Sequence, residues 1–204
     1  LRDARSAGAL TVVNTVYDFR AELASPDERW PLGGDDAYRL VDLLVADAEE
    51  AARLSGAGTP EAAVDWFIEH GVGAAIVTNG PSPVWFAAAG PRFAPAQTAS
   101  RPVFTGFARG EATRGGDTTG CGDTFTGGVV ASIAEQLERL HLAARAQTDD
   151  MAAARGRGGS SDRRLDLDTA VVRGVASGAF CLTHLGGTYL EPAAGEKLQR
   201  VREV

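Results

Sequence analysis

Short apolar runs alternate with amphipathic stretches along most of this chain. The runs at residues 9–14, 41–46 and 74–78 are rich in Val, Leu, Ile and Ala. Buried strands of a parallel sheet have this composition, and the helical stretches between them would supply the crossover connections. The pattern therefore predicts an α/β fold with a mostly parallel sheet.

Helices are predicted from apolar residues at helical spacing and from capping residues. Thr59 can cap a helix that begins at Pro60, and Gly71 can end it in a left-handed conformation. The predicted helices cover residues 2–7, 48–54, 60–70, 120–146 and 167–185. The helix at residues 120–146 is the longest, and the helix at 167–185 is rich in small residues that allow close packing.

The remaining segments are less regular. Prolines and paired glycines make residues 18–36 mostly loop, and frequent prolines favour edge or antiparallel strands at 84–88 and 103–108. Residues 148–164 are rich in Asp, Arg, Gly and Ser, so we expect a mobile surface loop there.

Composition narrows the class of protein. The 204 residues carry a net charge of −7, which disfavours nucleic acid as a partner because phosphate backbones are also negative. Apolar runs are too short to span a bilayer, which argues against a membrane role. Cys121 and Cys181 form neither a disulfide framework nor a paired zinc motif, so we expect reduced thiols and a cytoplasmic location.

The segment from Asp117 to Gly128, with the sequence DTTGCGDTFTGG, carries the candidate chemistry. Gly120 and Gly122 flank Cys121 where a loop becomes the longest helix, so unobstructed backbone N–H groups could bind an anion. Asp123 falls in the first helical turn, where it could accept the proton of an attacking hydroxyl. A capped helix with a glycine turn, without catalysis, is the structural alternative.

The same segment closely resembles the C-terminal signature of the ribokinase-like (PfkB) carbohydrate kinases, written D-T-x-G-A-G-D with a following F-x-G-G. The resemblance implies that Asp123 is the catalytic base and that Gly120, Cys121 and Gly122 supply the anion-hole amides. Cys121 stands where alanine is usual. Asp117 and Thr119 would begin a loop that holds a monovalent cation, commonly K⁺, and Mg²⁺ would arrive with ATP.

Other segments follow the order of motifs in that family. Residues 47–50 resemble its N-x-x-E element, which implies that Glu50 tunes Mg²⁺ and phosphate binding; an acidic helix start is the alternative. Thr78 and Gly80 resemble its T-x-G nucleotide turn, or form a bare turn between strands. Gly186 follows the helix that resembles the adenine-side helix of the family.

The resemblance covers nearly the whole chain but begins in the middle of the family's fold. It implies that residues 1–204 are the C-terminal part of one kinase domain, a three-layer α/β/α sandwich with a mostly parallel sheet. The implied reaction is ATP-dependent phosphorylation of a primary hydroxyl of a sugar or sugar-like substrate, in a protein that could be a homodimer. A nucleoside kinase and a non-catalytic binding relative are the alternatives. A dinucleotide-binding oxidoreductase is disfavoured because no G-x-G-x-x-G follows the first strand.

Overall fold

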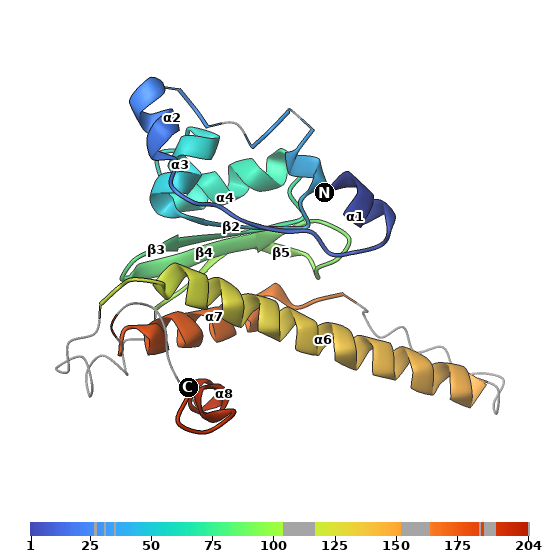
Figure 1. Ribbon diagram of the computed structural model, residues 1–204. Helices are drawn as coiled ribbons and strands as arrows, with labels where there is room; N and C mark the ends of the chain where they lie inside the picture. The colour runs from blue at the N-terminus through green and yellow to red at the C-terminus, as the bar shows by residue number, and fades with distance from the viewer. Residues whose placement is uncertain are drawn as a thin grey trace.

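A mixed sheet forms the middle layer of the structure, a computed structural model that describes residues 1–26, 28–30, 32–34, 36–103, 117–151, 164–183, 185 and 191–203. Within these residues one five-stranded sheet lies between layers of helices (Figure 1). The strands, in order across the sheet, are β1 (Val12–Asn14), β2 (Leu43–Asp47), β3 (Ala74–Asn79), β4 (Ser82–Ala88) and β5 (Ala96–Arg101). The α/β/α architecture predicted from the sequence is confirmed.

Strand direction divides the sheet into two parts. β1, β2 and β3 are parallel, whereas β4 pairs antiparallel with both β3 and β5. The antiparallel strand predicted at residues 84–88 is therefore present as β4. β5 was not predicted, because its half-buried sequence AQTASR lacks an apolar run. Apart from Val103, the strand predicted at residues 103–108 lies outside the described residues.

Helices α3 (Ala48–Ser55) and α4 (Pro60–Glu69) cover one face of the sheet, above it in Figure 1. Thr59 caps α4 as predicted, since its side chain accepts a hydrogen bond from the Ala62 amide at 3.2 Å. The predicted helix near the N-terminus is α1 (Arg2–Ser6). A further short helix, α2 (Phe19–Ala24), lies where a loop was expected, and its start is capped by Asp18.

The opposite face is covered by α6 (Cys121–Met151) and α7 (Leu167–Cys181), with α8 (Glu196–Arg202) outside them (Figure 1). α6 continues to Met151, so residues 148–151 are helical where a loop was predicted, and residues 152–163 of that predicted loop lie outside the described part. α7 ends at Cys181 instead of continuing to residue 185. These two helices run side by side in opposite directions, which places the start of α6 beside the end of α7 (Figure 1).

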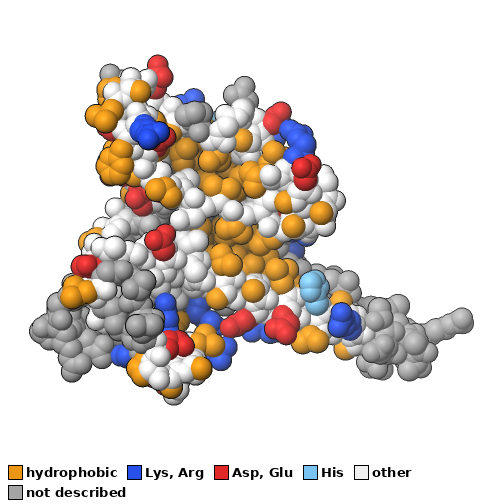
Figure 2. Space-filling view, viewed as in Figure 1, with side chains coloured by type: hydrophobic (Ala, Val, Ile, Leu, Met, Phe, Trp, Pro, Cys, Tyr) orange, Lys and Arg blue, Asp and Glu red, His pale blue; other side chains and the backbone are white. Residues whose placement is uncertain are grey.

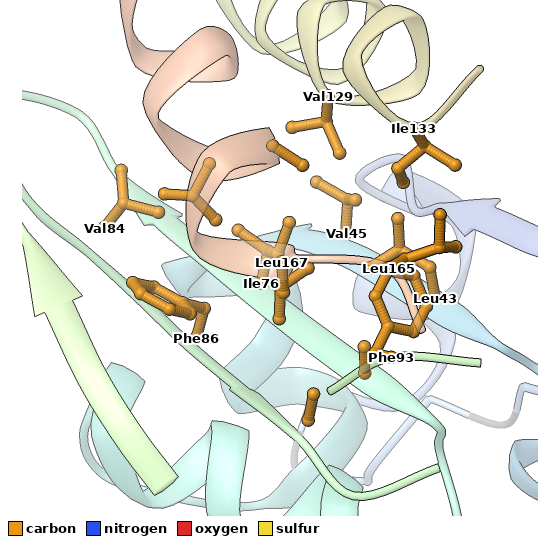
Figure 3. Packing of buried hydrophobic residues seen from close by; sticks show 14 of the residues in the cluster. Leu43, Val45, Ile76, Val84, Phe86, Phe93, Val129, Ile133, Leu165 and Leu167 are labelled. Carbon is orange, nitrogen blue, oxygen red and sulfur yellow. The ribbon is translucent and has the colours of Figure 1, made fainter. Parts of the chain in front are cut away.

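Successive side chains along each central strand point to opposite faces of the sheet and form a hydrophobic core on each face. Leu43 and Val45 of β2 point toward α6 and α7, whereas Leu44 and Ala46 belong to the core under α3 and α4. Figure 3 shows the core between the sheet and helices α6 and α7, in which Val129 and Ile133 of α6 meet side chains from the central strands. Burial of both faces explains why the strands read as continuous apolar runs in the sequence.

Some apolar side chains stay outside these cores. Figure 2 shows hydrophobic side chains gathered between the helix layer above the sheet and α6. Val16, Phe19 and Leu23 follow the edge strand β1 and are each more than two thirds exposed, at 78%, 71% and 87%. Across the described ranges, no helix is both long enough and apolar enough to cross a membrane.

Candidate functional site

The carboxyl ends of the parallel strands form the edge of the sheet where polar groups gather. Asn14 is the last residue of β1, Asp47 ends β2, and Thr78 pairs with Asp47 in the register of β2 and β3. Ligands of open α/β sheets bind outside this edge. The strand order therefore brings the predicted Glu50 and Thr78 regions to one end of the molecule.

The start of α6 is attached to the same edge. The Thr126 hydroxyl, in the second turn of α6, donates a hydrogen bond of 3.1 Å to the Asn14 side-chain oxygen. On its other side α6 lies against α7: a Cβ placed on Gly178 would lie 3.3 Å from the Cys121 carbonyl oxygen. Contacts with β1 and with α7 thus fix the position of the first α6 turn.

The turn before α6 is closed by local hydrogen bonds, one of which uses the Cys121 amide that was expected to be free. The Asp117 carboxylate accepts a hydrogen bond of 2.9 Å from the Thr119 amide, and Gly120 is left-handed with φ of +77°. The Cys121 amide then donates to the Thr118 carbonyl at 3.2 Å, and the Thr124 amide donates to the Gly120 carbonyl at 2.8 Å. A residue with a Cβ would be strained at position 120.

The next amides of α6 have the properties of an anion site. In the part of the chain that the structure describes, the amides of Gly122 and Asp123 donate to no backbone carbonyl. Gly122 is exposed, and a Cβ placed on it would meet no described atom within 4 Å. Unpaired donors at the positive end of a long helix, in front of open space, suit a phosphate group.

Asp123 points to the surface. Asp123 is exposed to solvent, and it lines a pocket of about 430 Å³ between α6, α7 and α8. Arg173 and Ser177 of α7 and Lys197 of α8 are among the other residues that line it. A carboxylate at such a position is accessible to a substrate hydroxyl, which a buried cap would not be.

An ion-pair group holds the three helices around this pocket. The guanidinium groups of Arg173 and Arg202 donate to the two oxygens of the Glu135 carboxylate at 3.3 and 3.1 Å. Hydrogen bonding from Arg173 is the largest cause that lowers the pKa of Glu135, and Arg202 lowers it further. Glu135 therefore remains ionised and links α6 to both α7 and α8.

Glu50 has a clear local role. Its carboxylate accepts hydrogen bonds from the Asp47 amide at 3.1 Å and from the Thr15 hydroxyl at 2.5 Å. The Asp47 carboxylate in turn accepts from the Glu50 amide at 2.8 Å, which completes a capping box at the start of α3. Only 7% of Glu50 is exposed. The structural alternative, an acidic helix start, is thus present, and a role of Glu50 toward Mg²⁺ or phosphate stays a prediction.

The Thr78–Gly80 segment is a turn between antiparallel strands. Asn79 pairs with Ser82 across the β3–β4 hairpin, and Gly80 has φ of +51°. The Thr78 hydroxyl donates weakly to the Ala46 carbonyl, at 3.5 Å. Nucleotide contacts of Thr78 and Gly80 stay predictions, and Gly186 lies outside the described residues.

The predicted cation loop is occupied by local hydrogen bonds. Asp117 binds the Thr119 amide, and the Thr119 carbonyl accepts a hydrogen bond of 3.4 Å from the Cys181 thiol. Among the described residues no group of three or more His, Cys, Asp and Glu side chains could hold a metal ion. K⁺ binding by Asp117 and Thr119 also stays a prediction.

Three residues near the site, Asn14, Thr15 and Thr126, were not predicted to belong to it. Thr126 lies one helical turn after Asp123, and Asn14 and Thr15 directly follow a predicted buried strand. The rule that ligands lie beyond the carboxyl ends of parallel strands could have singled out the last two. Nothing local in the sequence links Thr126 to Asn14, because this contact depends on how α6 crosses the sheet.

Comparison with known proteins agrees with this architecture. The family model described as "pfkB family carbohydrate kinase" matches residues 7–194, and the chain belongs to this family. No curated protein matches the sequence.

Solved structures show the same fold at low sequence identity. An Arabidopsis thaliana ribokinase complexed with ribose and ATP is 16% identical, with a TM-score of 0.61 over 98% of this chain and 50% of its own. A putative ribokinase II from E. coli in complex with ATP and Mg²⁺ is 19% identical, with a TM-score of 0.57 over 98% and 51%. The Schistosoma mansoni adenosine kinase in complex with adenosine and AMP is 14% identical, with a TM-score of 0.56 over 93% and 46%. The chain thus spans about half the length of these structures.

Proposed function

We propose that the protein is an ATP-dependent kinase that phosphorylates a primary hydroxyl of a sugar or sugar-like substrate. Residues 1–204 would form the C-terminal part of its kinase domain. The observation that carries the proposal is the first turn of α6, where the unpaired amides of Gly122 and Asp123 lie beside the exposed Asp123 carboxylate. Family membership supports the same reaction class.

Each group in this turn has a separate task. The unpaired backbone amides of Gly122 and Asp123 would bind the transferred phosphoryl group and balance its growing negative charge. The Cys121 amide, which the motif resemblance also assigns to this task, would first have to leave the Thr118 carbonyl. The Asp123 carboxylate would accept the proton of the substrate hydroxyl as its oxygen attacks. Mg²⁺ bound to the ATP phosphates would neutralise part of their charge. Asp117 and Thr119 would position the loop and, with K⁺ bound, add positive charge behind it.

Removal of the Asp123 charge tests this assignment. In the intact protein, Asp123→Asn should lower kcat by roughly 10²–10⁴-fold, because the amide cannot accept the proton. ATP affinity should change little, since the backbone donors remain. Turnover can be followed as transfer of labelled phosphate from ATP to a panel of sugars and nucleosides.

Asp168→Asn is the matched control. Asp168 is also an aspartate in the first turn of a helix, α7, where it is partly exposed and pairs with Arg101 at 2.6 Å outside the proposed site. We expect this variant to keep its turnover rate. An active Asp123→Asn variant, or equal losses in both variants, would contradict the role of Asp123.

A nucleoside kinase is the second candidate, and the likeness to adenosine kinase supports it. Both candidates would use the same base and the same amides, so the substrate panel separates them. Turnover with nucleosides and none with free sugars would favour the second candidate. The cysteines, which are unpaired in the described structure, support a cytoplasmic location for either enzyme.

A further inference from the structure

The only two cysteines of the chain lie beside each other at the candidate site. Cys121 is the first residue of α6 and Cys181 is the last residue of α7. The antiparallel packing of these helices brings the two cysteines together. The helices are so close that a Cβ placed on Gly178 of α7 would lie 3.3 Å from the Cys121 carbonyl oxygen. Their pairing depends on the fold, since they are distant in the sequence.

The two thiols interact with each other and with the turn that precedes α6. Cys181 is only 6% exposed, and its thiol donates to the Thr119 carbonyl at 3.4 Å. Burial raises the pKa of the Cys121 thiol to about 12, with further contributions from the neighbouring Cys181 thiol and the Asp117 carboxylate. Cys121 is half-buried, so a small oxidant can reach it before it reaches Cys181.

We infer that Cys121 and Cys181 form a reversible disulfide when the protein meets a hydroperoxide such as H₂O₂. The Cys121 sulfur attacks one peroxide oxygen, the O–O bond breaks, and a sulfenic acid and one water form. The Cys181 sulfur then displaces hydroxide from the sulfenic acid, which leaves as a second water after taking the thiol proton. The two thiols are thereby oxidised to one S–S bond, and the peroxide is reduced to two waters.

The disulfide would act on the turn that carries the proposed phosphate site, so this part of the inference rests on the proposed function. The new bond removes the thiol donor of the Thr119 carbonyl and draws Cys121 toward α7. Gly120 lies between these two points and has a special left-handed conformation. We expect the oxidised protein to bind ATP about tenfold more weakly, because a displaced turn would no longer hold its amides in place for the phosphate.

Thiol counting tests the disulfide without reference to activity. After H₂O₂ treatment of the intact chain, the number of free thiols among Cys121 and Cys181 should fall from two to none. The mass of the chain should fall by that of two hydrogen atoms. A peptide joining residues 121 and 181 should appear before reduction, and dithiothreitol should reverse the change. Retention of both thiols, or cross-links only between molecules, would overturn the inference.

Single variants and the unfolded chain supply the controls. In the Cys181→Ser variant, oxidation should stop at the sulfenic acid of Cys121, and the mass should not fall by two hydrogen atoms. In the Cys121→Ala variant, the Cys181 thiol should stay reduced. In denaturant a smaller share of the oxidised Cys121 should end in the bond to Cys181, because the fold no longer holds the two thiols together. An equal share in folded and denatured chains would contradict the structural basis of the pair.

ATP binding before and after oxidation tests the effect on the turn. A weaker affinity that dithiothreitol restores supports the inference, and an unchanged affinity in the fully oxidised protein overturns its regulatory part. If the reduced protein neither binds ATP nor transfers phosphate, the proposed function fails, whereas the thiol count still decides whether the disulfide forms.

Discussion

The two faces of the sheet are packed in different ways. Under α3 and α4 the core contains large aromatic side chains: Phe67 is fully buried, and Tyr38 meets Trp66 edge-on with ring centroids 5.2 Å apart. The core on the other face also buries the rings of Phe86, Phe93 and Phe125, but there glycines in addition let α6 and α7 approach closely. A Cβ on Gly128 would lie 2.4 Å from the Ser177 hydroxyl oxygen, and one on Gly174 would lie 2.7 Å from a Val129 methyl.

Because of this difference, we expect substitutions on the two faces to change the stability of the fold and the geometry of the site to different degrees. Large side chains supply much of the apolar area that stabilises the fold. Close glycine contacts bury less area, but they fix where helix ends lie relative to each other. Because the candidate site is made from the start of α6 and the end of α7, we expect changes on the α6–α7 face to affect the site more than their cost in stability suggests.

The largest loss of stability is expected when a fully buried aromatic ring is removed, and Phe67 provides such a ring on the α3–α4 face. Phe67→Ala removes a fully buried aromatic ring and should lower the free energy of unfolding by about 3–5 kcal/mol. Denaturant unfolding measures this loss. Under conditions where the variant remains folded, its ATP affinity should match that of the parent protein. A large loss of ATP affinity in the folded variant would show that the two faces are not separable.

A smaller cost in stability is expected between α6 and α7, where two adjacent glycines form a matched pair. Gly128→Ala should destabilise the protein by about 1–3 kcal/mol, because its methyl group would overlap Ser177 and the Arg173 carbonyl. Gly127→Ala places a methyl where no described atom lies within 4 Å and should stabilise by about 0.5–1 kcal/mol. Thermal unfolding of both variants checks the difference in sign, and equal effects would contradict the close helix approach.

The smallest effect is expected for the ion pairs outside the core. Glu135→Gln removes the carboxylate that links Arg173 and Arg202, and partly exposed pairs contribute about 0–1 kcal/mol. Because the folded-state pKa of Glu135 is lowered, the contribution is present above its ordinary pKa of about 4.3 and is lost as the pH falls through the lowered value. Unfolding curves of parent and variant should thus converge in acid, and a gap that widens with falling pH would contradict the pairing.

The sequence predicted those elements whose patterns are local. The runs that became β2 and β3 are apolar because both faces of the sheet are buried, and Thr59 with Pro60 marked the start of α4 correctly. β5 and α2 were missed because an edge strand needs little apolar character and a six-residue helix leaves a weak periodic signal.

For the site, the motif predicted the turn and the start of α6 but not what surrounds them. The left-handed Gly120 and the unpaired amide of Gly122 follow from residues close in sequence. The contact of Thr126 with Asn14 and the approach of Cys181 to Cys121 join segments that are far apart in the chain, so they depend on helix packing. Glu50 takes part in a capping box, which was the structural alternative considered for this residue. Its contact with the Thr15 hydroxyl, which helps to enclose the carboxylate, joins distant segments and could not be predicted from the sequence.

The central claim is that the amides at the start of α6 hold a phosphate of ATP, and a methyl group on Gly122 tests it most directly. Gly58, which lies between α3 and α4 outside the pocket of Asp123, is the control. Like Gly58, Gly122 has no described atom within 4 Å of an added Cβ, so Gly122→Ala and Gly58→Ala should both keep the melting temperature of the parent protein. Calorimetric titration of the intact protein with ATP and Mg²⁺ should show about tenfold weaker binding for Gly122→Ala only, because its Cβ crowds the path of the phosphate. Equal, parent-like ATP affinity in both variants would contradict the account.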